Sequence, residues 1–124
     1  MPDLTLTVAI GNYGHTTPLK DGSVTSDMFR MEQIEVSPVV SIFRRMVRGL
    51  EFDVAEMALA TYFCARAHGK RFIGIPVFLT RDFYHGAVVC RADSGIATPK
   101  DLEGRKVGVR SYTLTPGVDR KSVV

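Results

Sequence analysis

The sequence lacks any apolar run long enough to cross a membrane. A membrane-spanning helix needs roughly 18 or more mostly apolar residues in succession, and no stretch of this 124-residue chain approaches that length. The first residues, MPDLTLTVAIG, also lack the basic region and long apolar segment of a secretory signal peptide. If Met1 is the natural start, we therefore expect a cytoplasmic protein without a membrane partner.

Basic clusters of the kind that bind nucleic acid are also missing. The net charge is +3, but the basic residues are scattered, and the densest group is Arg44, Arg45 and Arg48. These three fall on the polar face of an expected helix, where a solvated surface is the default interpretation. No basic motif interleaved with aromatic residues is present, so no nucleic-acid partner is predicted.

Patterns that bind metal or form disulfides are equally scarce. The two cysteines, Cys64 and Cys90, lie in apolar segments without CxxC spacing, which predicts buried free thiols. His15, His68 and His85 lie in three different segments and form no HExxH or HxxxH motif. We therefore predict no metal and no cofactor.

The residues that are present alternate between strand and helix patterns. Composition is that of an ordinary globular domain, with 45% hydrophobic and 23% charged residues. Expected strands cover residues 4–10, 28–36, 52–57, 72–80, 86–90 and 106–109, and expected helices begin at 38, 59 and 99. This alternation predicts an α/β fold with a mostly parallel sheet flanked by helices.

Two of the expected helices carry capping signals. Ser37 is placed as the N-cap of the first helix, with Pro38 at its first helical position. Thr98 and Asp101 have the spacing of a capping box at the start of the short third helix.

Polar residues follow the expected strands at one edge of the sheet. In open α/β sheets, ligands bind beyond the carboxyl ends of the strands. The candidates collected in this way are Tyr13, Glu56, Met57, Arg81, His85, Arg110, Tyr112 and Thr113. We expect them to converge on a small-molecule site.

Each candidate has a structural alternative. Arg81 can hold a carboxylate in a bidentate manner or can pair with Asp82. His85, with an ordinary pKa near 6.5, can transfer a proton or can serve only the loop. Glu56 lies before a helix, where a carboxylate is favourable for electrostatic reasons alone.

The aromatic and hydroxyl-bearing candidates are also open to two interpretations. Tyr13 and Tyr112 can stack on an aromatic ring, although loop tyrosines are common without a ligand. The segment from Arg110 to Thr113 can bind an anion through its hydroxyl groups and the first amides of a following helix.

Several segments, taken in order, resemble one family. The motifs are EFDVAEM, then IPVFxxRxFxHxA, then SGIxxPKDLxGxxVGVxxYxxT. As a set they resemble the 4,5-dihydroxyphthalate decarboxylase-like proteins, which are related in fold to type II periplasmic solute-binding proteins. The resemblance implies two α/β lobes with a ligand cleft between them, and it extends to Val118.

The resemblance also suggests where the native sequence ends. Residues 1–118 are expected to be the N-terminal part of the first lobe. The last six residues, DRKSVV, match the translation of a common sequencing adapter in this frame. We therefore interpret residues 119–124 as a non-native tail and the chain as a fragment.

The resemblance implies a reaction in the full-length protein. It would remove CO2 from an aromatic dicarboxylate such as 4,5-dihydroxyphthalate and leave a dihydroxybenzoate. Arg81 would hold a carboxylate, His85 would deliver the proton, and Tyr13, Tyr112 and Thr113 would contact the ring and its hydroxyl groups. The expected partner is thus a small aromatic carboxylate, and the oligomeric state stays open.

Two other outcomes stay open. A solute-binding protein of the type that serves ABC transporters would capture a small anionic or aromatic ligand without chemistry, on the same fold. The fragment by itself is expected to be inactive, because half a lobe leaves sheet edges and apolar helix faces uncovered.

Overall fold

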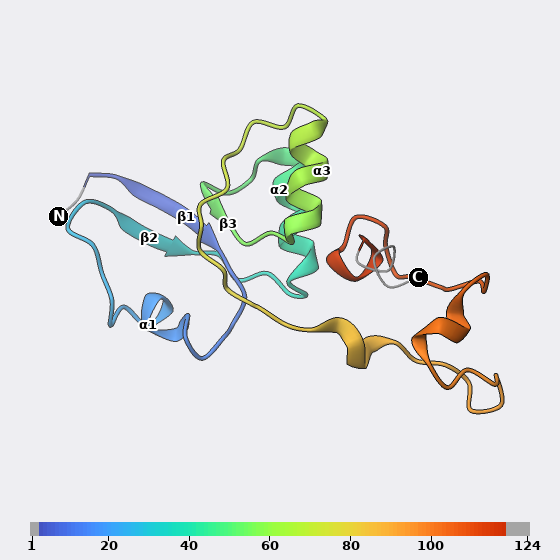
Figure 1. Ribbon diagram of the computed structural model, residues 1–124. Helices are drawn as coiled ribbons and strands as arrows, with labels where there is room; N and C mark the ends of the chain where they lie inside the picture. Colours follow the sequence, from blue (N-terminus) through green and yellow to red (C-terminus); the bar gives the residue numbers. More distant parts are fainter. Residues whose placement is uncertain (1–2, 119–124) are drawn as a thin grey trace.

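A computed structural model describes residues 3–118 of the chain (Figure 1). For His85 it describes the backbone alone. The predicted non-native tail, residues 119–124, lies outside the described residues. No helix within the described range is both long enough and apolar enough to cross a membrane.

The centre of the fold is a parallel sheet of three strands. The strands are β1 (Thr5–Ala9), β2 (Arg30–Gln33) and β3 (Val54–Ala55), in the order β2-β1-β3. Val8 of β1 lies opposite Gln33 on one side and Val54 on the other. The predicted α/β class and the parallel sheet are thus confirmed.

Strand β3 is short but is anchored to β1 by a side chain. The Asp53 carboxylate accepts hydrogen bonds of 2.8 Å from both the backbone N–H and the hydroxyl of Thr7. In return, the Asp53 N–H donates to the Thr7 hydroxyl at 3.0 Å. Because these bonds favour the ionised form, they lower the pKa of Asp53.

Helix α2 (Val40–Gly49) places its apolar stripe against the end of the sheet. Ile42, Phe43 and Met46 are buried together with Ala9 and Phe52. Full burial of one such side chain contributes about 1.5–3 kcal/mol. This single cluster therefore holds α2 and the strand ends in place.

The expected start of α2 is wrong. Ser37 provides no cap, because the helix begins at Val40, two residues later than expected, with Val39 as N-cap. Backbone N–H groups of Ser41 and Ile42 donate to the carbonyls of Pro38 and Val39, which makes a tight turn before the helix. Helix α2 ends at Gly49, and its C-cap residue, Leu50, has a left-handed backbone conformation with φ of 51°.

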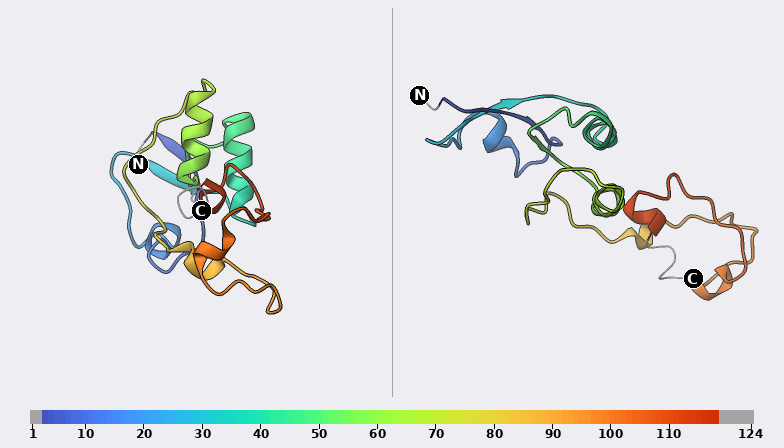
Figure 2. Two further views of the ribbon diagram at one scale, coloured as in Figure 1. Left: turned by 45° about the vertical axis from the view of Figure 1, so that its right-hand side comes forward. Right: turned by 90° about the horizontal axis from the view of Figure 1, so that it is seen from above.

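Helix α3 (Leu59–Ala67) matches its expected position but buries little. It lies alongside α2 (Figure 2), and Ala65 is its one buried residue. Cys64 on this helix and Cys90 further along are both exposed. The prediction of buried thiols is wrong because an apolar segment is buried only where another element covers it.

Three expected strands in the described part of the chain do not form, and they are those at 72–80, 86–90 and 106–109. Two short 3-10 helices, η1 (Tyr84–Ala87) and η2 (Pro99–Leu102), interrupt an otherwise irregular segment. This segment runs away from the sheet (Figure 1). Ile73 and Val89 are 87% and 88% exposed.

The absence of these strands has a physical reason. A strand is stable when its backbone groups pair with a neighbouring strand, and apolar character alone does not supply that neighbour. In the same region, a capping signal was enough to predict a short helix, because a capping box needs no distant segment of the chain. Thr98 and Asp101 form the predicted capping box of η2, with the Thr98 N–H donating to Asp101 at 2.8 Å.

Candidate functional site

The carboxyl ends of β1 and β3 meet at the Glu56 carboxylate. One carboxylate oxygen, Oε2, accepts a hydrogen bond of 2.8 Å from the Gly11 N–H, and Oε1 accepts one of 2.7 Å from the Tyr13 hydroxyl. The Glu56 N–H donates to the Ala9 carbonyl at 2.9 Å. We call Gly11, Tyr13, Thr16 and Glu56 the sheet-edge site.

Tyr13 is held in its protonated form at this site. Burial of the phenol raises its pKa to about 12, and the hydrogen bond to Glu56 and the charge of Glu56 act in the same direction. The phenol is therefore a hydrogen-bond donor at neutral pH. Its ring stacks on His15, with centroids 5.5 Å apart and planes at 4°.

Gly11 lets the Tyr13 ring approach the backbone closely. A Cβ atom at position 11 would lie 2.7 Å from the ring and hydroxyl atoms of Tyr13. Only glycine leaves room for this approach, so the sequence GNY that follows β1 is suited to this local geometry.

Thr16 fixes the loop that carries Tyr13. It is 1% exposed, and its hydroxyl accepts from the Tyr13 N–H at 3.0 Å. The same hydroxyl lies 3.0 Å from the carbonyl oxygens of both Gly11 and Tyr13. Sequence reasoning missed this residue, although a threonine three positions after Tyr13 is typical of a side-chain-stabilised turn.

Replacing Thr16 by valine is expected to lower the free energy of unfolding by about 1–3 kcal/mol, because it leaves buried backbone groups unpaired. Urea unfolding measures the change. The matched control is Thr5→Val at the exposed first position of β1, which should change stability by less than about 0.5 kcal/mol. Equal effects of the two substitutions would contradict the role of the Thr16 hydroxyl.

A second polar group lies beside the sheet-edge site. The Lys20 ammonium donates to the Ile10 carbonyl at 3.0 Å and forms an ion pair of 2.7 Å with Glu35. Asn12 donates to the other Glu35 oxygen at 3.1 Å. The hydrogen bond from Lys20, and to a lesser extent that from Asn12, lower the pKa of Glu35. Lys20 and Glu35 were also missed, because their partners are distant in the sequence.

The structure brings Tyr13 and Glu56 together but does not place Arg81 or Tyr112 with them. The Arg81 guanidinium lies 4.8 Å from the centre of the Phe78 ring, and no ion pair joins it to Asp82, whose carboxylate accepts from the Phe83 N–H instead. The Tyr112 side chain is 72% exposed.

The other two candidates near these segments have different surroundings. Met57 packs against the core cluster from its edge. The His85 side chain is outside the description, and its backbone belongs to η1. The proposed role of His85 therefore stays a prediction.

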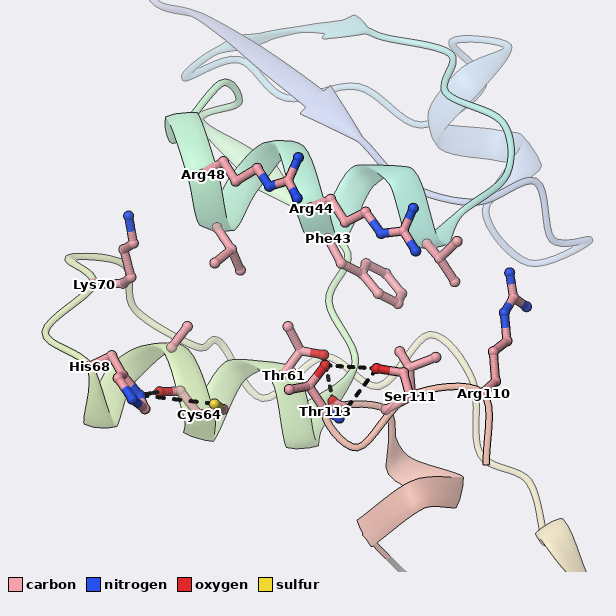
Figure 3. A pocket seen from close by; sticks show the side chains of 14 residues that line it. Phe43, Arg44, Arg48, Thr61, Cys64, His68, Lys70, Arg110, Ser111 and Thr113 are labelled. Atoms are coloured by element: carbon pink, nitrogen blue, oxygen red, sulfur yellow. Dashed lines mark hydrogen bonds between the residues drawn. The ribbon is translucent and has the colours of Figure 1, made fainter. Parts of the chain in front are cut away.

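Arg110 and Thr113 line a pocket of about 340 Å³ between α2 and α3 (Figure 3). Thr113 is fixed there, because the Thr61 hydroxyl of α3 donates to its carbonyl at 2.8 Å. Arg44 and Arg48 of α2 face the same space (Figure 3). The sequence showed these arginines as a cluster but indicated only a solvated helix face.

Metal ligands do not gather at either place. Within the described residues, no group of three or more His, Cys, Asp or Glu side chains could hold a metal ion. What the sheet-edge site offers is a protonated phenol fixed by a carboxylate, and what the pocket offers is a set of cations.

Comparison with known proteins identifies the relatives of this chain. No family model matches it. Two curated proteins named 4,5-dihydroxyphthalate decarboxylase match over 123 residues each: one from Comamonas testosteroni at 39% identity, and one from Pseudomonas putida at 37%. The chain is similar in sequence to the 4,5-dihydroxyphthalate decarboxylases over nearly its whole length. The resemblance noted from the motifs is thus confirmed.

The two matches cover this chain and its relatives unequally. Each covers 95% of this chain, but 36% of the Comamonas protein and 46% of the Pseudomonas protein. The chain thus spans less than half the length of the curated relatives it matches.

Proposed function

We propose that this protein acts in the decarboxylation of an aromatic dicarboxylate such as 4,5-dihydroxyphthalate, with a dihydroxybenzoate and CO2 as products. The observation that carries the proposal is the identity of 37–39%, over 95% of the chain, to two proteins named for that activity. A parallel sheet with polar groups at its carboxyl edge supports a small-molecule site.

The chemistry sets three requirements. The bond between the ring carbon and the leaving carboxylate breaks, CO2 departs, and the electron pair stays on the ring carbon. An acid must then deliver a proton to that carbon, so that a C–H bond replaces the broken bond. The carboxylate that remains needs a cationic partner to hold the ring in position.

We assign these requirements to residues of this chain. Arg81 holds a carboxylate, and His85 delivers the proton. Tyr13, Tyr112 and Thr113 contact the ring and its hydroxyl groups. The raised pKa keeps the Tyr13 phenol protonated, and its one O–H donates to Glu56 at 2.7 Å, so Tyr13 offers the substrate its ring face and its hydroxyl oxygen as an acceptor.

Three further residues have supporting roles in the proposal. Both Glu56 oxygens are already occupied by Gly11 and Tyr13, so we assign Glu56 to orienting Tyr13 for the substrate. Met57 supports it from the core side, and Arg110 adds positive charge for an anionic substrate.

We also propose that the 124 residues alone do not turn over substrate. Large apolar side chains between residues 72 and 89 are exposed, and they include Ile73, Phe83 and Val89. Arg81 and His85 lie within this uncovered segment. Catalysis needs such groups held within a fraction of an ångström, which requires the segment to be packed.

The test is a CO2-release assay with 4,5-dihydroxyphthalate and phthalate. It compares the 124-residue chain with a chain extended to the length of the relatives. In the extended chain, Arg81→Ala and His85→Ala are each expected to lower kcat by roughly 100-fold or more. Arg91→Ala is the control, because Arg91 pairs with Asp93 in an exposed turn.

Each result of this assay is informative. Near-normal turnover in both the Arg81 and His85 variants would remove their assigned roles. Saturable binding without product in the extended chain would favour the solute-binding alternative. Turnover by the 124-residue chain would contradict its proposed inactivity.

A further inference from the structure

The pocket between α2 and α3 has the size of a site for a small organic molecule. Its volume of about 340 Å³ falls within the range of about 300–1,000 Å³ that is usual for such sites. Part of its lining is apolar, with Phe43 and Val47 from α2 and Leu114 from the C-terminal segment. We call it the basic pocket, because the charged side chains that line it are Arg44, Arg48, Lys70 and Arg110.

Its charged lining is of one sign. Arg44, Arg48, Lys70 and Arg110 line it, and no Asp or Glu does. None of these four side chains forms an ion pair with another residue in the range 3–118. Figure 3 shows them spaced around the opening. Unneutralised cations of this kind raise the local potential and attract anions.

The neighbouring arginine shows that this arrangement is not a general property of α2. Arg45 is paired with Glu51 at 2.7 Å and covers the Phe52 ring at 4.7 Å. It does not line the basic pocket. The structure therefore separates the arginine cluster into one neutralised member and two members that face the pocket.

Hydroxyl groups close one side of the pocket. The Thr61 hydroxyl donates to the Thr113 carbonyl at 2.8 Å, which ties α3 to the C-terminal segment. The Ser111 and Thr113 hydroxyls lie 3.1 Å apart. These groups add hydrogen-bonding capacity beside Arg110 without adding negative charge.

We propose that the basic pocket binds a small aromatic carboxylate; it shares Arg110 and Thr113 with the substrate contacts proposed above, and Tyr13 and Glu56 lie outside its lining. The ring packs on Phe43, Val47 and Leu114, and the carboxylate groups pair with Arg44, Arg48 and Arg110. Arginine suits this ligand because its planar guanidinium pairs with a carboxylate in a bidentate manner. The inference rests on the proposed function only in the choice of an aromatic dicarboxylate as probe.

Binding of phthalate to the 124-residue chain, measured by calorimetry, tests the proposal. The double variant R44Q/R48Q is expected to raise the Kd roughly tenfold or more, because it removes two charge-assisted contacts. The matched control R45Q removes one charge from the same helix outside the pocket and should change the Kd by less than about twofold. Salt should weaken binding, because the Debye length falls from about 10 Å at 0.1 M to about 3 Å at 1 M.

The two cysteines locate the bound probe without a substitution. Both thiols are exposed, but Cys64 lines the basic pocket and Cys90 does not. Phthalate is therefore expected to slow the alkylation of Cys64 by iodoacetamide and to leave that of Cys90 unchanged, as measured by mass spectrometry. Benzamide, a neutral ring, and inorganic phosphate, an anion without a ring, should each protect Cys64 less than phthalate does.

The outcomes separate this inference from the proposed function. Cys64 protection that is lost in R44Q/R48Q supports the pocket even if no product forms in the extended chain. Turnover in the extended chain with no Cys64 protection overturns the pocket and leaves the function standing. Equal protection of both thiols, equal effects of R45Q and R44Q/R48Q, or equal protection by inorganic phosphate also overturns it.

Discussion

Replacing Ile42 by alanine is expected to lower the free energy of unfolding by about 2–5 kcal/mol. Ile42 is 0% exposed and belongs to the cluster with Ala9, Phe43, Met46 and Phe52. The substitution removes three buried carbon atoms and leaves a cavity in the only cluster that joins α2 to the strands within residues 3–118. Urea unfolding followed by far-ultraviolet circular dichroism measures the loss.

The control for Ile42 is Ile73, a residue of the same type in the segment expected as a buried strand. The structure places Ile73 at 87% exposure, so Ile73→Ala should change the free energy of unfolding by less than about 0.5 kcal/mol. A loss at Ile73 as large as that at Ile42 would show that residues 72–80 are packed and would contradict the structure.

Neutralising Glu56 is expected to lower the pKa of Tyr13. In the native chain this pKa is raised from its ordinary value of 10.0 to about 12, first by burial and then by Glu56. Glu56→Gln removes the charge but not the burial, so the pKa should fall to a value between those two. Ring-carbon NMR of labelled tyrosine measures it, and Tyr13→Phe identifies the signal.

Glu35→Gln is the matched control for this titration. Glu35 lies at the same edge of the sheet, but it pairs with Lys20 and Asn12 and makes no hydrogen bond to Tyr13. Its neutralisation should leave the pKa of Tyr13 near 12. If both glutamate variants shift Tyr13 equally, the effect is general and the hydrogen bond to Glu56 is not its cause.

The same pKa predicts a pH dependence of stability. Because the folded state raises the pKa of Tyr13, the unfolded chain loses this proton first as the pH rises. The contribution of protonated Tyr13 is therefore complete below pH 10 and is lost progressively up to about pH 12. Tyr13→Phe should lack this part of the decline.

The N-terminal half of the fold was predictable because its signals are local and its partners are nearby. Alternating residues from Leu4 to Ile10 and the apolar stripe of Ile42, Phe43 and Met46 indicated β1 and α2, and both formed. The capping box of Thr98 and Asp101 formed for the same reason, because it needs only four consecutive residues.

The site was predictable in part. The rule that polar residues gather at the carboxyl ends of parallel strands brought Tyr13 and Glu56 to one place, and they are in contact. The rule did not apply to Arg81, Arg110 and Tyr112, because the strands expected to precede them did not form. The sequence did not indicate that Arg44 and Arg48 share a pocket with Arg110, since that depends on how α2 lies beside α3.

The sequence by itself determined the α/β class, the parallel pairing of the first strands, most helix positions and the kinship with the 4,5-dihydroxyphthalate decarboxylases. Only the tertiary structure decided which apolar segments are buried, which cysteines are exposed and which arginines face a common pocket. The reason is physical: helix periodicity and capping are settled within a few residues. Strand pairing, burial and charge convergence depend on which distant segment supplies the other side.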